Sequence, residues 1–287
     1  MSAGPAPVDA AVSPWAGRRR RAEALRARHR FAAEPLALYL ALLPVQEDAW
    51  SAVRESPPHP SELPSWAATR VLPAVVEATV AAGPATLGAA ARRRLAEGAA
   101  GDALAGWLAG TELDPVDRYL ARASLGPVLE ALGEAAGAAC TRGWNDEGAE
   151  RCPCCGGPPQ LSSLADSGQS LVNGPRSLLC ARCGLTWKFS RSVCPACGES
   201  GEEQLRVYAE HLQGPVSGNG KESGDVQPVF PHLRIAACST CNRYLIEVDM
   251  ARDEGAVPEV DELAALPLDL HASDQGLTKV TPNLMGF

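Results

Sequence analysis

The stretch CARCGLTWKFSRSVCPACG, residues 180–198, contains four cysteines arranged as two CxxC pairs. Two more pairs flank it, Cys152 with Cys155 and Cys238 with Cys241. Two residues between cysteines let the backbone turn so that both sulfurs face one metal ion, and amides of the turn can hydrogen-bond to the thiolates. The eight paired cysteines therefore predict two sites of four thiolates each.

The residue after each pair supports the same interpretation. After the second cysteine of a metal knuckle, the chain often adopts a positive φ angle, which glycine and asparagine tolerate best. A thioredoxin-like redox motif would instead need a βαβ context, which this sequence lacks. All four CxxC pairs have a residue that tolerates a positive φ angle at the next position. These residues are Gly156, Gly184, Gly198 and Asn242.

The spacing between pairs indicates which of them share an ion. The successive gaps are 24, 10 and 40 residues long. The two longer gaps each contain two strand candidates and can fold back as a hairpin. The ten residues after Cys183 are predicted as one strand, which carries its ends apart at about 3.3 Å per residue. We therefore expect sequential pairing, with a RING-like interleaving as the alternative. The predicted sites are Cys152, Cys155, Cys180 and Cys183, and Cys194, Cys197, Cys238 and Cys241.

The chemistry of such sites is limited. Four thiolates fill a tetrahedral shell, so metal-assisted hydrolysis is disfavoured and a structural role is the default. We expect two metal ions, zinc or iron, one per site. CPCCG and CPACG are rubredoxin-type knuckles, which are compatible with iron. The usual order of metal affinities, however, favours zinc over ferrous iron. Cys154 is predicted to be an exposed bystander, and Cys140 a small buried apolar residue.

The rest of the chain has two regions of different pattern. Residues 15–141 predict helices: EPLALYLALL places Leu36, Leu40 and Leu43 on one face, and DPVD gives one helix Asp114 as its N-cap. From about residue 150, six short alternating runs predict strands: PQLSSLAD, RSLLC, LTWKFSRSV, LRVYAE, LRIAAC and RYLIEVDM.

The predicted fold class is α+β multidomain, an all-α N-terminal helical domain followed by two small β-rich rubredoxin-like or zinc-ribbon modules. In the last unit, Leu263, Leu266 and Leu270 would share one face of a short helix, although Pro267 is awkward there. The expected units are a flexible tail at 1–14, a helical domain at 15–148, four-cysteine modules at 149–191 and 192–250, and a C-terminal tail with the short helix at 251–287.

Charge argues against nucleic acid as a partner. Residues 150–250 hold nine Lys and Arg against ten Asp and Glu, whereas a duplex binder needs clustered positive charge. Lys188, Arg191 and Arg182 are too few to form a stripe. The run Arg18–Arg21 is predicted to be a solvated helix turn. No apolar run approaches the roughly 18 residues that cross a bilayer, so we expect a cytoplasmic protein without membrane insertion.

The motifs together resemble the formate dehydrogenase accessory protein family, FdhE. The specific part is the central CxxxWxxxRxxCxxC pattern, carried by Cys183, Trp187, Arg191, Cys194 and Cys197. RHRFAAEPLALYLALLPVQ near the N-terminus and VDELAALPLDLHASDQGL near the C-terminus are similar to the family as well. A Gly-rich insertion at 213–231 and Pro267 depart from the family's pattern.

The resemblance implies a non-enzymatic role in maturing respiratory formate dehydrogenase, by binding its catalytic subunit before export and cofactor completion. It also implies that the eight paired cysteines are metal ligands. A nucleic-acid-binding ribbon protein and a rubredoxin-like iron redox protein are the alternatives.

Overall fold

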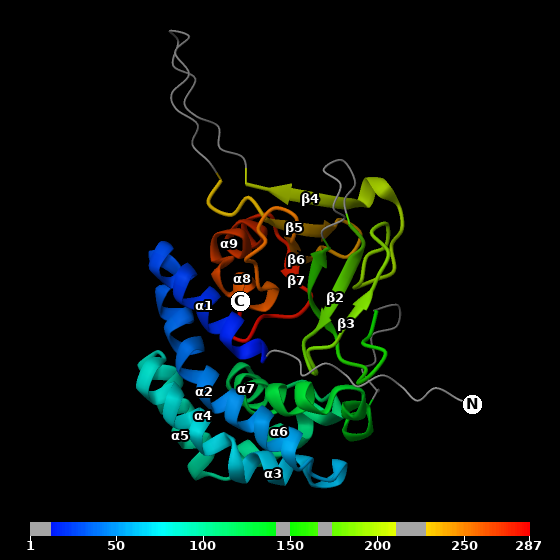
Figure 1. Cartoon of the computed structure of the whole chain (residues 1–287). Coiled ribbons are helices and arrows are strands. Elements are labelled where there is room, and N and C mark those ends of the chain that lie inside the picture. Colours follow the sequence, from blue (N-terminus) through cyan, green and yellow to red (C-terminus); the bar gives the residue numbers. More distant parts are fainter. Residues whose placement is uncertain (1–12, 142–149, 166–173, 211–227) are drawn as a thin grey trace, which may run out of the picture.

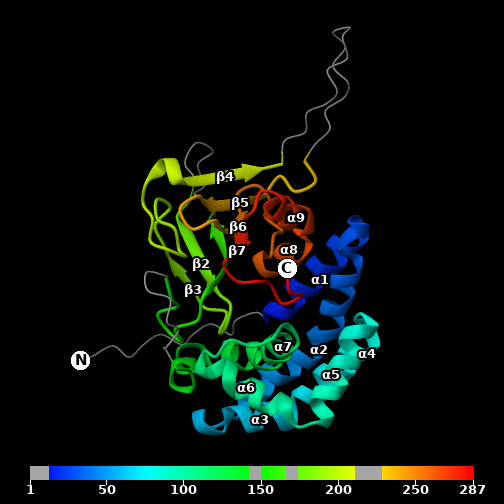
Figure 2. The ribbon, with the colours of Figure 1, turned by 180° about the vertical axis from the view of Figure 1, so that it is seen from behind.

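The computed structural model describes residues 13–141, 150–165, 174–210 and 228–287. Most of the predicted tail at 1–14 and of the insertion at 213–231 lies outside the described residues. A layer of helices packs below a twisted sheet, and two C-terminal helices cover one face of that sheet (Figures 1 and 2). The predicted order, helical region first and sheet-rich region second, is confirmed.

The N-terminal region is helical throughout its described length. Helix α2 is the central helix of this region, and its apolar side chains contribute to two separate cores. Leu38 and Leu42 join the core of the helical bundle, whereas Leu36 and Leu43 join the core that lies under the sheet. The helices are α1 (Pro14–Arg28), α2 (Ala33–Glu55), α3 (Leu63–Arg70), α4 (Leu72–Ala82), α5 (Ala85–Ala96), α6 (Ala99–Ala109) and α7 (Pro115–Leu132).

Helix α7 begins as its sequence predicts. The Asp114 carboxylate accepts hydrogen bonds from the backbone amides of Val116, at 2.9 Å, and Asp117, at 3.1 Å. Pro115 occupies the first turn, where its missing N–H has no cost. Gly126 and Pro127 predict that this helix is kinked or split, but it continues past both residues to Leu132.

Removing this cap has a measurable expected cost. Asp114→Ala leaves two amides of the first turn without their acceptor and should lower the free energy of unfolding by about 1 kcal/mol. Glu77→Ala, at an exposed position within α4, should change it by less than about 0.5 kcal/mol. Urea denaturation of both variants checks the difference, and equal midpoints would contradict it.

All six predicted runs form strands, and they belong to one sheet. The strand order is β3-β2-β1-β6-β5-β4, with β7 beside β6. β1 runs parallel to β6, which joins the two antiparallel halves. The expected boundary at residues 191–192 therefore separates chain segments whose strands share a sheet. The strands are β1 (Pro159–Leu164), β2 (Arg176–Cys180), β3 (Thr186–Lys188), β4 (Leu205–Ala209), β5 (Leu233–Cys238), β6 (Arg243–Asp249) and β7 (Thr278–Lys279).

The C-terminal segment differs from the single short helix that was expected. It forms α8 (Pro258–Ala264) and α9 (Leu266–Asp274), because the chain breaks at Ala265 and Pro267 lies in the first turn of the second helix. Leu263 is buried, but Leu270 is 65% exposed. The predicted shared face of Leu263, Leu266 and Leu270 is wrong, since the break changes the helix direction between them.

The arginine run in α1 is not a solvated turn. The Arg18 guanidinium pairs with Glu130 of α7 at 2.9 Å and with Glu259 of α8 at 2.7 Å. Arg21 pairs with Asp261 of α8 and with Asp253. These ion pairs join α1 to elements more than 100 residues away in the chain, and so connect the helical region to the C-terminal helices.

Candidate metal centres

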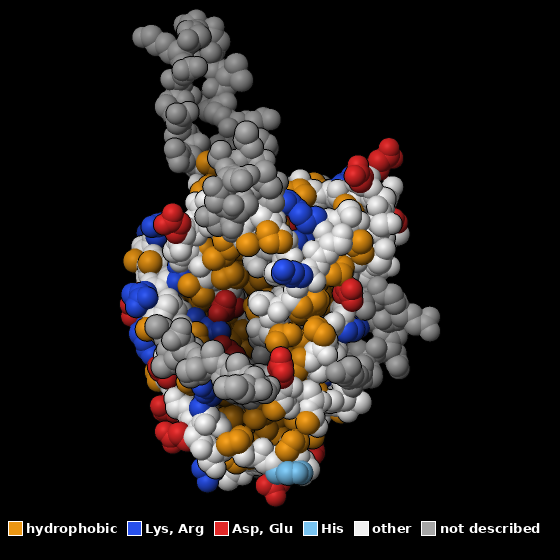
Figure 3. All heavy atoms as spheres, turned by 45° about the vertical axis from the view of Figure 1, so that its right-hand side comes forward, with side chains coloured by type: hydrophobic (Ala, Val, Ile, Leu, Met, Phe, Trp, Pro, Cys, Tyr) orange, Lys and Arg blue, Asp and Glu red, His pale blue; other side chains and the backbone are white. Residues whose placement is uncertain are grey.

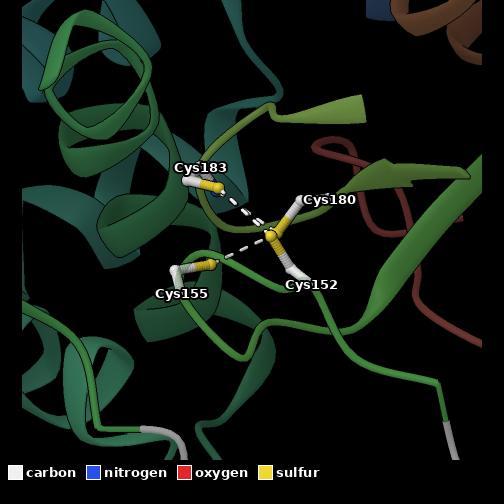
Figure 4. A group of neighbouring side chains, drawn as sticks. All are labelled: Cys152, Cys155, Cys180 and Cys183. Carbon is white, nitrogen blue, oxygen red and sulfur yellow. Dashed lines mark hydrogen bonds between the residues drawn. The ribbon is translucent and has the colours of Figure 1, made fainter. Parts of the chain in front are cut away.

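The first group of cysteines lies between the helical bundle and the sheet. Cys152 and Cys155 come from the loop before β1, and Cys180 and Cys183 come from the end of β2 and the turn that follows. The four side chains point toward one another (Figure 4). All four are buried and belong to the core of the helical bundle.

The sulfur positions match a tetrahedral metal site. The Cys152 and Cys183 sulfurs are 3.7 Å apart, and those of Cys155 and Cys180 are 3.4 Å apart. Zinc–thiolate bonds of about 2.3 Å give a tetrahedron with edges of about 3.8 Å. The four sulfurs therefore fit around one ion of this size with only small adjustments.

The second group has the same form and lies at the same end of the sheet, because β6, which Cys241 precedes, runs parallel to β1. Cys194 and Cys197 follow the β3 segment, Cys238 ends β5, and Cys241 precedes β6. The sulfurs of Cys194 and Cys241 are 3.8 Å apart, as are those of Cys197 and Cys238. Cys197 and Cys241 are partly exposed. In both groups the ligand atoms lie within 4.8 Å of one another, so the sequential grouping is the one that the fold forms.

The four turns have the geometry that the sequence predicted. The residues after each pair have φ angles of 71°, 70°, 77° and 54°, at Gly156, Gly184, Gly198 and Asn242. In the first and third turns this residue's amide donates to the carbonyl of the first cysteine at 2.9 Å. Backbone amides also donate to sulfur, as from Ala196 to Cys194 at 3.4 Å. Such bonds stabilise thiolates.

Two residues beside the first group were not predicted to belong there. Arg182, inside the second pair, is only 1% exposed, and its Nη1 donates to the carbonyls of Cys155 at 2.9 Å and Thr141 at 3.2 Å. Cys140, predicted to be a small buried residue, is only partly buried and lies beside Cys155 and Arg182. Hydrogen bonds from Cys140 first, and then from the three other thiols of the group, lower the pKa of Cys155 below its usual value. No local pattern could reveal either contact, because each joins segments distant in sequence.

Cys154 lies outside both groups. Its sulfur faces the carbonyls of Gly133, at 3.6 Å, and Glu134, at 3.4 Å, in the 3-10 turn that follows α7. The side chain is partly buried rather than exposed, because this turn packs onto the first knuckle.

A third group of potential ligands holds an ion pair. His232, Asp253 and Asp261 lie close enough to hold a cation. However, the Arg21 guanidinium lies among them, with its Nε 3.0 Å from Asp261 and its Nη2 3.3 Å from His232 Nε2. Since this guanidinium already neutralises the carboxylates, we assign no metal here.

The two four-cysteine groups can therefore hold metal ions, and either zinc or iron suits four thiolates. All four tetrahedral positions would be protein ligands, so no position remains for a water or a substrate. The groups support a structural or an electron-transfer role rather than hydrolysis. Within the described part of the chain, no helix combines the length and the apolar character required to cross a membrane.

Comparisons with known proteins confirm the resemblance to the FdhE family. Residues 222–285 match the family described as FdhE, C-terminal domain. A protein FdhE homolog of Aquifex aeolicus is 29% identical over 136 residues, 47% of this chain and 41% of that protein. One from Stutzerimonas stutzeri is 31% identical over 47% of this chain and 37% of that protein. The matched segments thus span about two fifths of these relatives' length.

The fold is that of a solved structure. The crystal structure of the FdhE protein from Pseudomonas aeruginosa superimposes with a TM-score of 0.62, covering 94% of this chain and 95% of that one at 23% identity.

Proposed function

We propose that this chain, a relative of the FdhE proteins, is an accessory factor in the maturation of formate dehydrogenase. In this proposal it binds the catalytic subunit in the cytoplasm and holds one zinc or iron ion in each four-cysteine group. The observation that carries the proposal is the presence of two complete sets of four converging thiols in the fold of an FdhE protein. Complete coordination favours a binding protein over an enzyme.

The two sites differ in a way that bears on their roles. The first is surrounded by the bundle core and by Arg182, so metal loss there would expose apolar side chains. The second has two partly exposed cysteines, as electron transfer to a partner would require. Metal analysis of the purified protein discriminates between the roles: colourless protein with two zinc ions favours structural sites, and iron with a reversible visible absorption change favours a redox site.

Nucleic-acid binding is the weaker alternative. Of the basic residues Lys188, Arg191 and Arg182, Arg182 is buried. On the face drawn in Figure 3, basic side chains are interspersed with acidic and hydrophobic ones. Salt-sensitive retention of DNA or RNA by the purified protein would favour this alternative.

Deletion of the gene tests the maturation role. We expect formate dehydrogenase activity to be lost while the precursor of the catalytic subunit is still made, and activity to return with the wild-type gene. Catalytic subunit should also co-purify with the tagged protein from native lysate. Normal activity in the deletion strain would rule the proposal out.

A further inference from the structure

A cavity of about 100 Å³ lies beside the second cysteine group, between the sheet and the segment that leads into Cys194. Three arginines line it: Arg176 from β2, Arg191, and Arg243 from β6. The single carboxylate among the described lining residues is Glu247. We call this feature the arginine cavity.

Arg176 is buried without a strong partner. It is 6% exposed, yet among the described residues its Nη atoms reach only Ser162 Oγ at 3.4 Å and the Val193 carbonyl at 3.5 Å. Its Nε lies 3.6 Å from Glu247 and has no hydrogen-bond partner. A buried charge that lacks good hydrogen bonds is costly, so this guanidinium has the capacity to bind an oxyanion.

The other two arginines have no ion-pair partner among the described residues. Arg191 and Arg243 are exposed and line the same cavity. The thiolates of Cys194 and Cys238 also form part of the wall, and the Cys194 thiolate attracts the Arg176 guanidinium. The cavity therefore contains three guanidinium groups, of which Arg191 and Arg243 remain available to an acidic ligand.

The rim of the cavity indicates the kind of molecule that carries the anion. Leu205 and Val207 of β4 line it, and Val207 is 59% exposed. β4 is at the edge of the sheet, where an extended polypeptide can lie alongside a strand. A small free anion would use the arginines alone, whereas an acidic peptide would also use the apolar rim.

We propose that the arginine cavity binds a carboxylate side chain from an acidic, partly apolar segment of a partner polypeptide. Arginine pairs with carboxylates in bidentate geometry, and exclusion of water from Arg176 strengthens the interaction. This inference rests on the proposed function in one respect, namely that the partner is a protein.

A peptide-binding assay tests this proposal with purified, metal-loaded protein. The probe is a fluorescein-labelled peptide of alternating glutamate and valine, and its binding is followed by anisotropy at low and at physiological salt. We expect salt-sensitive binding that falls by at least about tenfold in Arg191→Glu/Arg243→Glu, a loss of about 1.4 kcal/mol. Arg176→Met should also weaken binding.

The matched control is Arg206→Glu. Arg206 is exposed on the same strand as Val207, but neighbouring residues of a strand point to opposite faces. This variant should bind within about twofold of the wild type, as expected for a charge on the far face that makes no contact. Metal content and melting temperature, measured for each variant, separate lost binding from lost folding.

The proposal would be overturned by unchanged affinity in the double variant, by an equal loss in Arg206→Glu, or by equal binding of a peptide with glutamine in place of glutamate. Displacement of the peptide by inorganic phosphate as effectively as by unlabelled peptide would show a site for free anions and would also overturn it. The assay contains no formate dehydrogenase, so its failure is distinct from a failure of the maturation role.

Discussion

Replacement of Cys180 and Cys183 by serine is expected to remove one metal ion per chain and to unfold much of the helical bundle. The four thiols of the first group are buried and pack in the same core as the bundle's leucines. Structural zinc contributes on the order of 10 kcal/mol to folding, which is comparable to the whole stability of a typical domain. Metal per chain, far-UV circular dichroism and hydrogen exchange of α2 and α7 measure the effect.

The equivalent double substitution in the second group should have a milder effect on folding. Cys194→Ser/Cys197→Ser should remove the other ion, but this group has two partly exposed members and is outside both apolar clusters. We expect local loss of order near β4, with the helical signal retained. Cys154→Ser is the control, because this thiol lies beside the first group without belonging to it, and both ions should remain.

This prediction would be contradicted if both ions were lost from either double variant while the helical signal stayed intact. Coupled loss from a folded chain would mean that the two sites share ligands. That result would contradict the separation of the sulfurs into two groups.

Features that depend on local constraints could be predicted from the sequence. Each CxxC turn needs a positive φ angle at the next position, and the sequence supplies a residue that adopts it. Alternating runs specify strands, and Asp114 with Pro115 specifies a helix start. The grouping of the cysteines was also predictable, although β3 is only three residues long and the rest of the expected strand is irregular or turn.

Features that depend on contacts between distant parts of the chain could not be predicted from the sequence. The pairing of Arg21 with Asp261 spans 240 residues, and nothing local distinguishes it from a solvated arginine in the same run. The parallel β1–β6 pairing, which joins the two halves of the sheet, also leaves no local pattern. Cys140 was assigned as an ordinary buried residue because its neighbour Cys155 comes from another part of the fold.

The C-terminal helices are held by a buried polar network that has Lys279 at its centre. Lys279 Nζ lies 2.9 Å from Glu262 of α8 and 3.1 Å from Asp269 of α9. Tyr244 of β6 donates to Asp269 at 2.8 Å, and Gln160 of β1 donates to Glu262. The lysine and both carboxylates are at least nine-tenths buried, so the network joins α8 and α9 to the sheet through fully desolvated charges.

Lys279→Met is therefore expected to lower the free energy of unfolding by about 3–5 kcal/mol, because it leaves two buried carboxylates without their cation. The burial that raises the pKa of Glu262 would then act without the lysine's opposing charge, so the pKa of Glu262 should rise further. Lys188→Met, the same change at an exposed site in β3, should alter stability by less than about 0.5 kcal/mol. Adding Glu262→Gln to Lys279→Met should recover part of the loss, since it removes one unpaired charge. Guanidinium denaturation of the metal-loaded variants measures all three, and equal midpoints for Lys279→Met and Lys188→Met would show that the network contributes little to the docking of these helices.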